Sequence, residues 1–138
     1  MAEFILEIIT PERVAYTDRV NLVTAPAVNG TIGILPRHVP LFTQLTEGEI
    51  KIKKGSEEFY LAIGGGFLEV TKSKVLVLVT RAVHAKELNE QEIVKARQAA
   101  EDALKQKPIG ENLAAAQAAL RQSLVDLRIL RRRKQRVH

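Results

Sequence analysis

The sequence predicts an α+β protein, in which an N-terminal antiparallel β-sandwich is followed by a C-terminal antiparallel two-helix hairpin. From Phe4 to Thr80, short apolar or alternating runs rich in Val and Ile are separated by turn residues, which is typical of strands. After Ala85 the apolar residues recur at three- and four-residue spacing, which is typical of amphipathic helices. The predicted boundary divides the 138 residues into a sandwich, residues 1–85, and a helical region, residues 86–138.

The predicted strands are short and closely spaced with no helix between them, which indicates a sandwich or a barrel. They are Phe4–Ile9, Arg13–Tyr16, Arg19–Ala25, Gly30–Leu35, Gly48–Lys53, Glu58–Ile63, Phe67–Thr71 and Lys74–Val79, with a shorter piece near Phe42. Turns are expected at Lys54-Gly55-Ser56 and at Lys72-Ser73. The run Gly64-Gly65-Gly66 is predicted to be a hairpin or bulge, because a phosphate-binding loop would need a Lys-Ser/Thr pair and a following helix.

The first helix is predicted to begin at a capping box, with Asn89 as the cap and Glu92 three residues later, and to end near Gln106. Its apolar face consists of Ile93, Ala96, Ala99, Ala100, Ala103 and Leu104. Pro108 and Gly110 separate it from a second helix. The second helix is expected to begin near Glu111 and to carry a stripe made of Leu113, Ala116, Leu120, Leu124, Leu127 and Leu130. Because this stripe is narrow, the hairpin is expected to be a mobile domain.

Composition excludes several classes of site. The chain has no cysteine, so disulfides, thiolate metal sites and cysteine nucleophiles are excluded, and three scattered histidines do not have metal-ligand spacing. No apolar segment approaches the length of a membrane span, and the N-terminus does not have the pattern of a signal peptide, so we expect a soluble, unexported protein. The sequence predicts no metal and no catalytic residue.

The residue patterns disfavour a stand-alone enzyme. His38 has no serine, cysteine or well-placed carboxylate near it in the sequence, so an interface role is favoured over a general base. Glu57 and Glu58 are adjacent, and neighbouring residues of a strand point to opposite faces, which separates the two carboxylates. Solvated charges at the sheet edge are the better interpretation.

The net charge of +5 comes from the end of the chain. The first 84 residues carry nine basic and nine acidic side chains, whereas the last 18 carry seven basic and one acidic. The run Arg131-Arg132-Arg133-Lys134-Gln135-Arg136 therefore suggests a partner. Nucleic acid, an acidic protein surface, anionic lipid and a merely solvated helix end all remain open, although the helical region lacks the aromatic residues that stack on bases.

Several separated motifs carry a family resemblance. They are Thr10-Pro11-Glu12-Arg13, the run GTIGILPRHVPL from Gly30 to Leu41, Leu45-Thr46-Glu47-Gly48, the run GGGFLEV from Gly64, and the helical hairpin after Ala82. In this order, across essentially the full length, they resemble the epsilon subunits of F-type ATP synthases of bacterial or chloroplast type. The resemblance implies a non-catalytic rotor subunit that couples proton-driven rotation to ATP synthesis.

The resemblance also implies partners and contact residues. The β-sandwich of the family holds the gamma subunit and lies on the ring of c subunits. The loop that resembles the ring contact comprises Val28, Asn29, Gly30, Thr31 and Ile32, and Thr31 is uncharged where some relatives carry a carboxylate. The segment that resembles the gamma contact comprises His38, Val39, Pro40, Leu41, Phe42 and Thr43.

The hairpin of bacterial relatives extends along gamma into the catalytic head of alpha and beta subunits and blocks ATP hydrolysis. By this resemblance an acidic segment of a beta subunit would be met by Arg121, Arg128, Arg131, Arg132, Arg133 and Arg136. The location implied is the cytoplasmic face of the bacterial inner membrane or, as the weaker alternative, the stromal face of thylakoids. Membrane association would then come only through the complex.

Some relatives bind ATP at the start of the first helix, but this chain departs from their pattern. Leu88 and Ala96 fit, whereas Asn89 replaces an Asp and Glu92 replaces an Arg, which places a carboxylate where a triphosphate would need a cation. We therefore expect no cofactor and no strong ATP binding.

Overall fold

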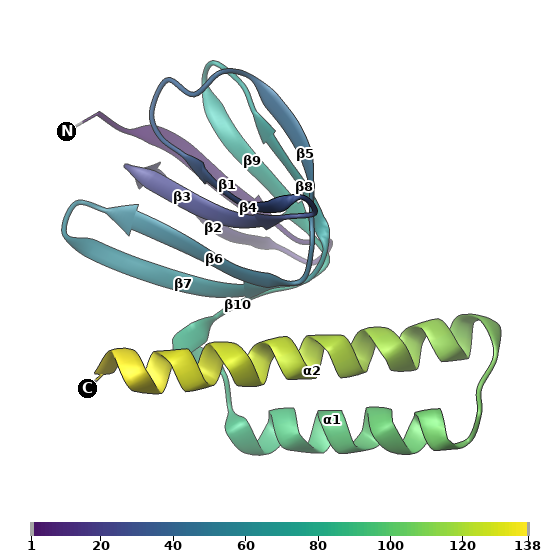
Figure 1. Cartoon of the computed structure of the whole chain (residues 1–138). Helices are drawn as coiled ribbons and strands as arrows, with labels where there is room; N and C mark the ends of the chain where they lie inside the picture. The colour runs from purple at the N-terminus through teal and green to yellow at the C-terminus, as the bar shows by residue number, and fades with distance from the viewer. Residues whose placement is uncertain (1, 138) are drawn as a thin grey trace. The chain divides into compact units, whose positions relative to one another are not determined.

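The computed structural model describes residues 2–137, and the side chains of residues 2–133. The chain divides into two compact units, Met1–Ala85 and Lys86–His138. The first consists of strands and the second of helices (Figure 1). The predicted fold class is confirmed, and each unit is described below by itself.

Ten strands form the first unit. They are β1 (Phe4–Ile9), β2 (Val14–Val20), β3 (Leu22–Ala27), β4 (Gly30–Ile34), β5 (Leu41–Leu45), β6 (Gly48–Lys54), β7 (Glu57–Ile63), β8 (Gly66–Val70), β9 (Lys74–Val79) and β10 (Ala82–His84). The hydrogen-bonded order is β10-β7-β6-β3-β5-β8-β9-β1-β2, with β4 paired to β3. All pairs are antiparallel except β1 with β9, which run parallel with Ile5 opposite Lys74.

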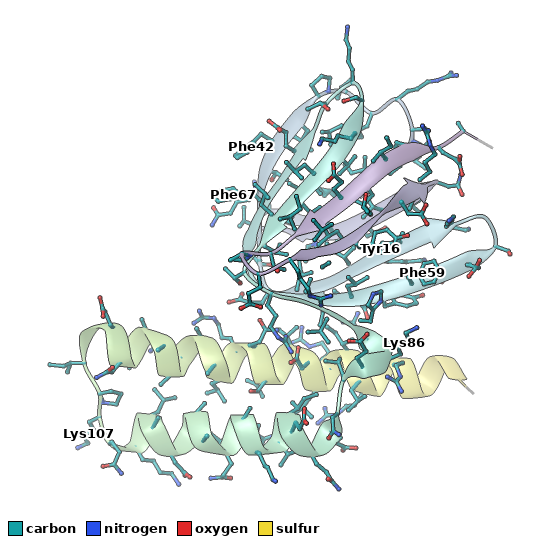
Figure 2. The ribbon with its side chains drawn as sticks, turned by 180° about the vertical axis from the view of Figure 1, so that it is seen from behind. Tyr16, Phe42, Phe59, Phe67, Lys86 and Lys107 are labelled. Carbon is teal, nitrogen blue, oxygen red and sulfur yellow. The ribbon has the colours of Figure 1, made fainter. Side chains whose placement is uncertain are left out.

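The strands curve around one apolar core (Figure 1). Its fully buried side chains alternate along the strands, as expected when one face of each strand points inward. They include Leu6, Ile8, Val20, Val23, Ile50, Ile52, Leu61 and Leu68. Tyr16 and Phe59 pack against this core from β2 and β7, with ring centroids 6.5 Å apart (Figure 2).

Three details of the sandwich differ from the sequence prediction. Asp18 and Arg19 belong to one strand, β2, and the break comes at Asn21, so the predicted strand Arg19–Ala25 is divided between β2 and β3. A tenth strand, β10, was not predicted. The Gly64–Gly66 run is neither a hairpin nor a bulge, because β7 and β8 do not pair and the glycines connect two strands that have different neighbours.

The glycine connection is needed because backbones approach closely there. A Cβ at Gly66 would overlap the backbone oxygen of Leu78 on β9. The amide of Gly64 donates to the oxygen of Arg81 at 3.0 Å, and Thr80 donates to the oxygen of Gly65 at 3.1 Å. A side chain at Gly66 would therefore push β8 away from β9.

The second unit is a pair of packed helices, α1 (Glu90–Lys105) and α2 (Gly110–Val137), which run antiparallel (Figure 1). A short 3-10 helix, η1 (Ala85–Glu87), precedes them. Asn89 caps α1 as predicted, since its side-chain oxygen accepts from the amide of Glu92 at 3.1 Å. Lys107, in the loop between the helices, takes left-handed backbone with φ 52° (Figure 2).

The predicted helix faces need correction. On α1 only Ile93 and Ala100 are buried, with Leu104 half-buried, whereas the three other alanines of the predicted face are exposed. On α2, Leu124 is 44% exposed, and the buried stripe continues through Ser123 instead. The Ser123 hydroxyl donates to the oxygen of Ala119 at 2.9 Å, so this small polar residue is buried with its hydrogen bond made.

Candidate interaction surfaces

The outer face of the sandwich carries a row of apolar side chains across neighbouring strands. Phe67 of β8 lies opposite Leu78 of β9, Leu78 lies beside Ile9 of β1, and Ile9 lies opposite Val14 of β2. Phe42 of β5 joins them, because its ring stacks on that of Phe67 with centroids 5.4 Å apart and planes at 22° (Figure 2). We call these five residues the apolar row.

Most of the apolar row is in contact with solvent. Phe42 is 65% exposed, Val14 is 55% exposed, and Phe67 and Leu78 are each 45% exposed. A cavity of about 390 Å³ beside them is lined by Ile9, Pro11, Phe67 and Leu78, among others. Two stacked aromatic rings in water, next to an apolar hollow, are typical of a surface that a partner covers.

The predicted ring-contact loop is a tight turn at one end of the sandwich. Ala27 of β3 pairs with Gly30 of β4, which leaves Val28 and Asn29 as the two turn residues. Gly30 has φ 124°, a conformation that a side chain would strain. Val28, Asn29, Gly30 and Thr31 are exposed, and Ile32 is half-buried against the core. The turn therefore presents uncharged side chains and backbone to a partner.

The predicted gamma-contact segment begins in the β4–β5 connection and continues into β5. Val39, Pro40 and Phe42 are exposed. His38, Leu41 and Thr43 are half-buried. Since the oxygen of Val39 only accepts, the His38 Nδ1 atom 2.6 Å away must carry the proton of that hydrogen bond. Phe42 joins the predicted segment to the apolar row.

A strained turn precedes this segment. The amide of His38 donates to the oxygen of Leu35 at 3.2 Å, with Pro36 at the second place of the turn and Arg37 at the third. Arg37 has φ 65°, and a turn of this pattern, type II, favours glycine at its third place. A side chain in left-handed backbone costs about 1 kcal/mol. The residue that bears this conformational cost, Arg37, is exposed and lies at the rim of a cavity.

The predicted arginines lie along the exposed part of α2. Arg121, Arg128, Arg131 and Arg132 are exposed and Arg133 is half-buried, whereas the side chain of Arg136 lies outside the described residues. Arg121, Leu124 and Arg128 follow at three- and four-residue spacing and so share one helix face. That face combines positive charge with one exposed leucine.

Several charged side chains of the sandwich form ion pairs or hydrogen bonds. Lys54 Nζ lies 2.5 Å from Asp18 Oδ2, and this hydrogen bond lowers the pKa of Asp18 and raises that of Lys54. The hydroxyl of Tyr16 has no hydrogen-bond partner among the described residues, and burial, followed by the Asp18 charge, raises its pKa. The hydrogen bond from Tyr60 lowers the pKa of Glu58.

The described residues include neither a cluster of metal ligands nor a helix that could span a membrane. Among residues with described side chains, no three His, Asp or Glu residues are grouped so as to hold an ion. The described helices include none that is long and apolar enough to cross a membrane.

The residues of the degenerate ATP pattern have other roles or lie in solvent. Asn89 is the cap of α1, Leu88 packs half-buried against the helix pair, and Glu92 and Ala96 are exposed. Arg97, a neighbouring cation, is paired with Glu101 at 3.1 Å.

Comparison with known proteins places the chain in a family. Residues 3–85 match the family model described as "ATP synthase, Delta/Epsilon chain, beta-sandwich domain". A relative from Herpetosiphon aurantiacus, "ATP synthase epsilon chain", is 42% identical over 131 residues, which cover 95% of this chain and 96% of the relative. The chain belongs to the ATP synthase epsilon-chain family. A second epsilon chain, from Dehalococcoides mccartyi strain BAV1, is 39% identical over 97% of this chain and 96% of its own length.

Solved structures agree with the fold. A chain in the cryo-EM structure of the Euglena gracilis mitochondrial ATP synthase superposes with a TM-score of 0.69 at 23% identity, over 100% of this chain and 83% of that one. A chain from the Tetrahymena thermophila enzyme, in a central stalk and c-ring structure, gives 0.60 at 16% identity, over 94% and 97%. The epsilon chain described here is therefore a non-catalytic subunit of the ATP synthase central stalk.

The sequence did not predict that four residues of the apolar row are candidate contact residues. Phe67, Leu78, Ile9 and Val14 were assigned to strands but not to a contact. The available signal was the composition of β9, KVLVLV, which is apolar on both faces. In an antiparallel sheet with one face in water such a strand should alternate, so its second apolar face needs a covering partner.

Proposed function

We propose that this epsilon chain transmits rotation between the c ring and the catalytic head, and that its hairpin inhibits ATP hydrolysis. The sandwich binds the gamma subunit through the apolar row and the segment from His38 to Thr43, and it contacts the c ring through the loop from Val28 to Ile32. The stacked, exposed pair of Phe42 and Phe67 is the observation that carries this proposal, because it needs a covering partner.

The inhibitory part of the proposal rests on the exposed basic face of α2. In the extended state its arginines pair with an acidic segment of a beta subunit, while Leu124 enters an apolar contact beside them. Guanidinium groups suit such a contact because they bind carboxylates in bidentate pairs. The chain then acts with alpha and beta subunits only in the inhibited state, as a peripheral subunit at the cytoplasmic face of the bacterial membrane.

The test is ATP hydrolysis by the catalytic head with gamma, assembled with the full chain or with its Met1–Ala85 fragment at matched occupancy. The fragment retains every strand of the sandwich. We expect higher hydrolysis with the fragment. A full-length variant with Arg121, Arg128 and Arg131 changed to Gln should show the same rise while keeping the hairpin. Equal hydrolysis in all three assemblies would reject inhibition and leave the coupling role.

ATP itself is not expected to control the hairpin. Glu92 places an exposed carboxylate in the first turn of α1, where it would repel a triphosphate, and Arg97 is already paired with Glu101. Isothermal titration of the full chain should show no micromolar affinity for ATP. Changing Glu92 to Arg provides the comparison, since this substitution adds a cation in the first turn.

A further inference from the structure

A second cavity, of about 370 Å³, lies at one end of the sandwich and has an apolar floor with a basic rim. The floor includes Ile34 of β4, Val70 of β8 and Val75 of β9, all of them buried. Arg37 and Lys72, from two different loops, stand at the rim and are exposed. We call this hollow the basic cavity. The basic cavity has no role in the contacts proposed above.

The positive charge at this rim is only partly compensated. Lys74, a third cation that lines the cavity, is paired with Glu7 through Nζ and Oε1 at 2.7 Å. Arg37 and Lys72 have no ion-pair or hydrogen-bond partner among the described residues. Two cations that converge on one hollow without a counter-ion favour an anionic occupant.

The backbone at Arg37 is a separate observation that points the same way. The turn from Leu35 to His38 places φ 65° at Arg37, where glycine would fit without strain. Steric strain that is held at an exposed charged residue is typical of a functional position. The fold would keep this turn with glycine, so the arginine side chain has a use other than folding.

The basic cavity continues into the proposed gamma contact. A shallower cavity of about 460 Å³, lined by Pro40, Leu41 and Phe42, shares the wall formed by Val70, Thr71 and Lys72. One surface therefore leads from the stacked aromatic pair to the two uncompensated cations. A partner that binds over Phe42 can therefore also contact the basic cavity, because the two cavities are continuous.

We propose that the basic cavity receives an acidic side chain of the gamma subunit together with an adjoining apolar residue. The carboxylate binds between Arg37 and Lys72, and the apolar residue lies on the floor against Ile34 and Val75. This inference deepens the proposed function and rests on it, because it names the chemistry by which gamma is recognised at this end of the sandwich.

The experiment measures the Kd of the full chain for the gamma subunit of the same enzyme at low and at moderate salt. Arg37→Gly should raise the Kd about tenfold at low salt, since a hydrogen bond to a charged group is lost. Lys72→Gln should raise it about threefold. Lys95→Gln, which removes an exposed lysine of α1, is the matched control and should change the Kd less than twofold.

Stability separates binding from folding in the same variants. Arg37→Gly should leave the thermal midpoint unchanged or raise it, because the strained turn accepts glycine. Arg37→Lys, which keeps the charge, should recover part of the affinity. A zero-length carboxyl-to-amine cross-linker should join Lys72 to gamma, and Lys72→Arg should abolish that product while keeping the affinity.

The results distinguish failure of gamma binding as a whole from failure of the basic cavity as part of that contact. If the unmodified chain does not bind gamma, the proposed function fails. If it binds, and Arg37→Gly binds equally well, the basic cavity is not part of the contact. Binding of the full chain to phosphatidylglycerol vesicles that is lost in Arg37→Gly, with gamma binding intact, would overturn the proposal in favour of an anionic lipid.

Discussion

Changing Phe42 and Phe67 together to serine should weaken gamma binding strongly while leaving the sandwich folded. Phe42 is 65% exposed and Phe67 45% exposed, so about half of the stacked pair is in water before any partner binds. An aromatic side chain brings about 150–250 Å² of surface, which leaves roughly 130 Å² of Phe42 and 90 Å² of Phe67 for a partner to bury. At about 25 cal/mol per Å² this burial would contribute at most about 5.5 kcal/mol.

The measured loss should be smaller than this limit. Association has costs that area does not include, so we expect about 3 kcal/mol, or roughly a hundredfold rise in Kd for gamma. Calorimetric titration of the variant and of Ile109→Ser provides the comparison. Ile109 lies in the loop between the helices and is 83% exposed, so this control removes exposed apolar surface away from the sandwich.

Folding must be checked in the same samples. Because both rings point away from the core, the thermal midpoint of the double variant should fall by only a few degrees. A variant that stays folded and binds gamma within threefold of the unmodified chain would refute the assignment of the apolar row as the gamma contact. Loss of folding would show instead that these two rings are needed for the stability of the sandwich.

Three further substitutions test the fold and its charges. Gly66→Ala should destabilise the sandwich by about 3 kcal/mol in denaturant unfolding, because the Cβ would overlap backbone of β9, whereas Gly65→Ala has room and should be nearly neutral. Asn89→Ala should lower the stability of the hairpin by about 1 kcal/mol, seen as earlier loss of helical circular dichroism. Asp18→Asn should lower the thermal midpoint at neutral pH, because the folded pKa of Asp18 lies below its unfolded value through the bond from Lys54. That contribution is present above the unfolded pKa and disappears as the pH falls through the folded one, so the two midpoints should meet once the pH is below the folded pKa of Asp18. A difference that persisted in that acid range would contradict the pairing.

Sequence predicted the fold well where one local pattern decides the structure. The short apolar runs of β1 and β9 predicted both strands at their observed bounds, and Asn89 marked the start of α1. The prediction was wrong where contacts between strands that are distant in the sequence determine the structure. The Gly64–Gly66 run was expected to be a hairpin or a bulge, since a glycine run does not show which strands it connects.

The contact surfaces were predictable only in part, for a related reason. Phe42 was predicted as a contact residue through the family resemblance. Leu78 belongs to a strand in which every residue after the first is apolar, so the sequence does not show which face is covered by the core. Arg37 was overlooked because a positive φ is a property of the folded turn. On α2, Leu124 fitted the leucine spacing, but Ser123 is the residue buried at this turn, while Leu127 and Leu130 are buried as predicted.

Because β1 pairs with β9, the sheet can be completed only after most of the sandwich has been translated. Because Ile5 lies opposite Lys74, the first strand to leave the ribosome lacks its neighbour on that side until nearly the whole sandwich has been translated. Such distant pairing slows folding, since a long loop must close before the contact forms. The helices come later still, after the last strand, β10. The sheet can therefore be completed before the helices have left the ribosome, so folding of the sandwich does not require the helical unit.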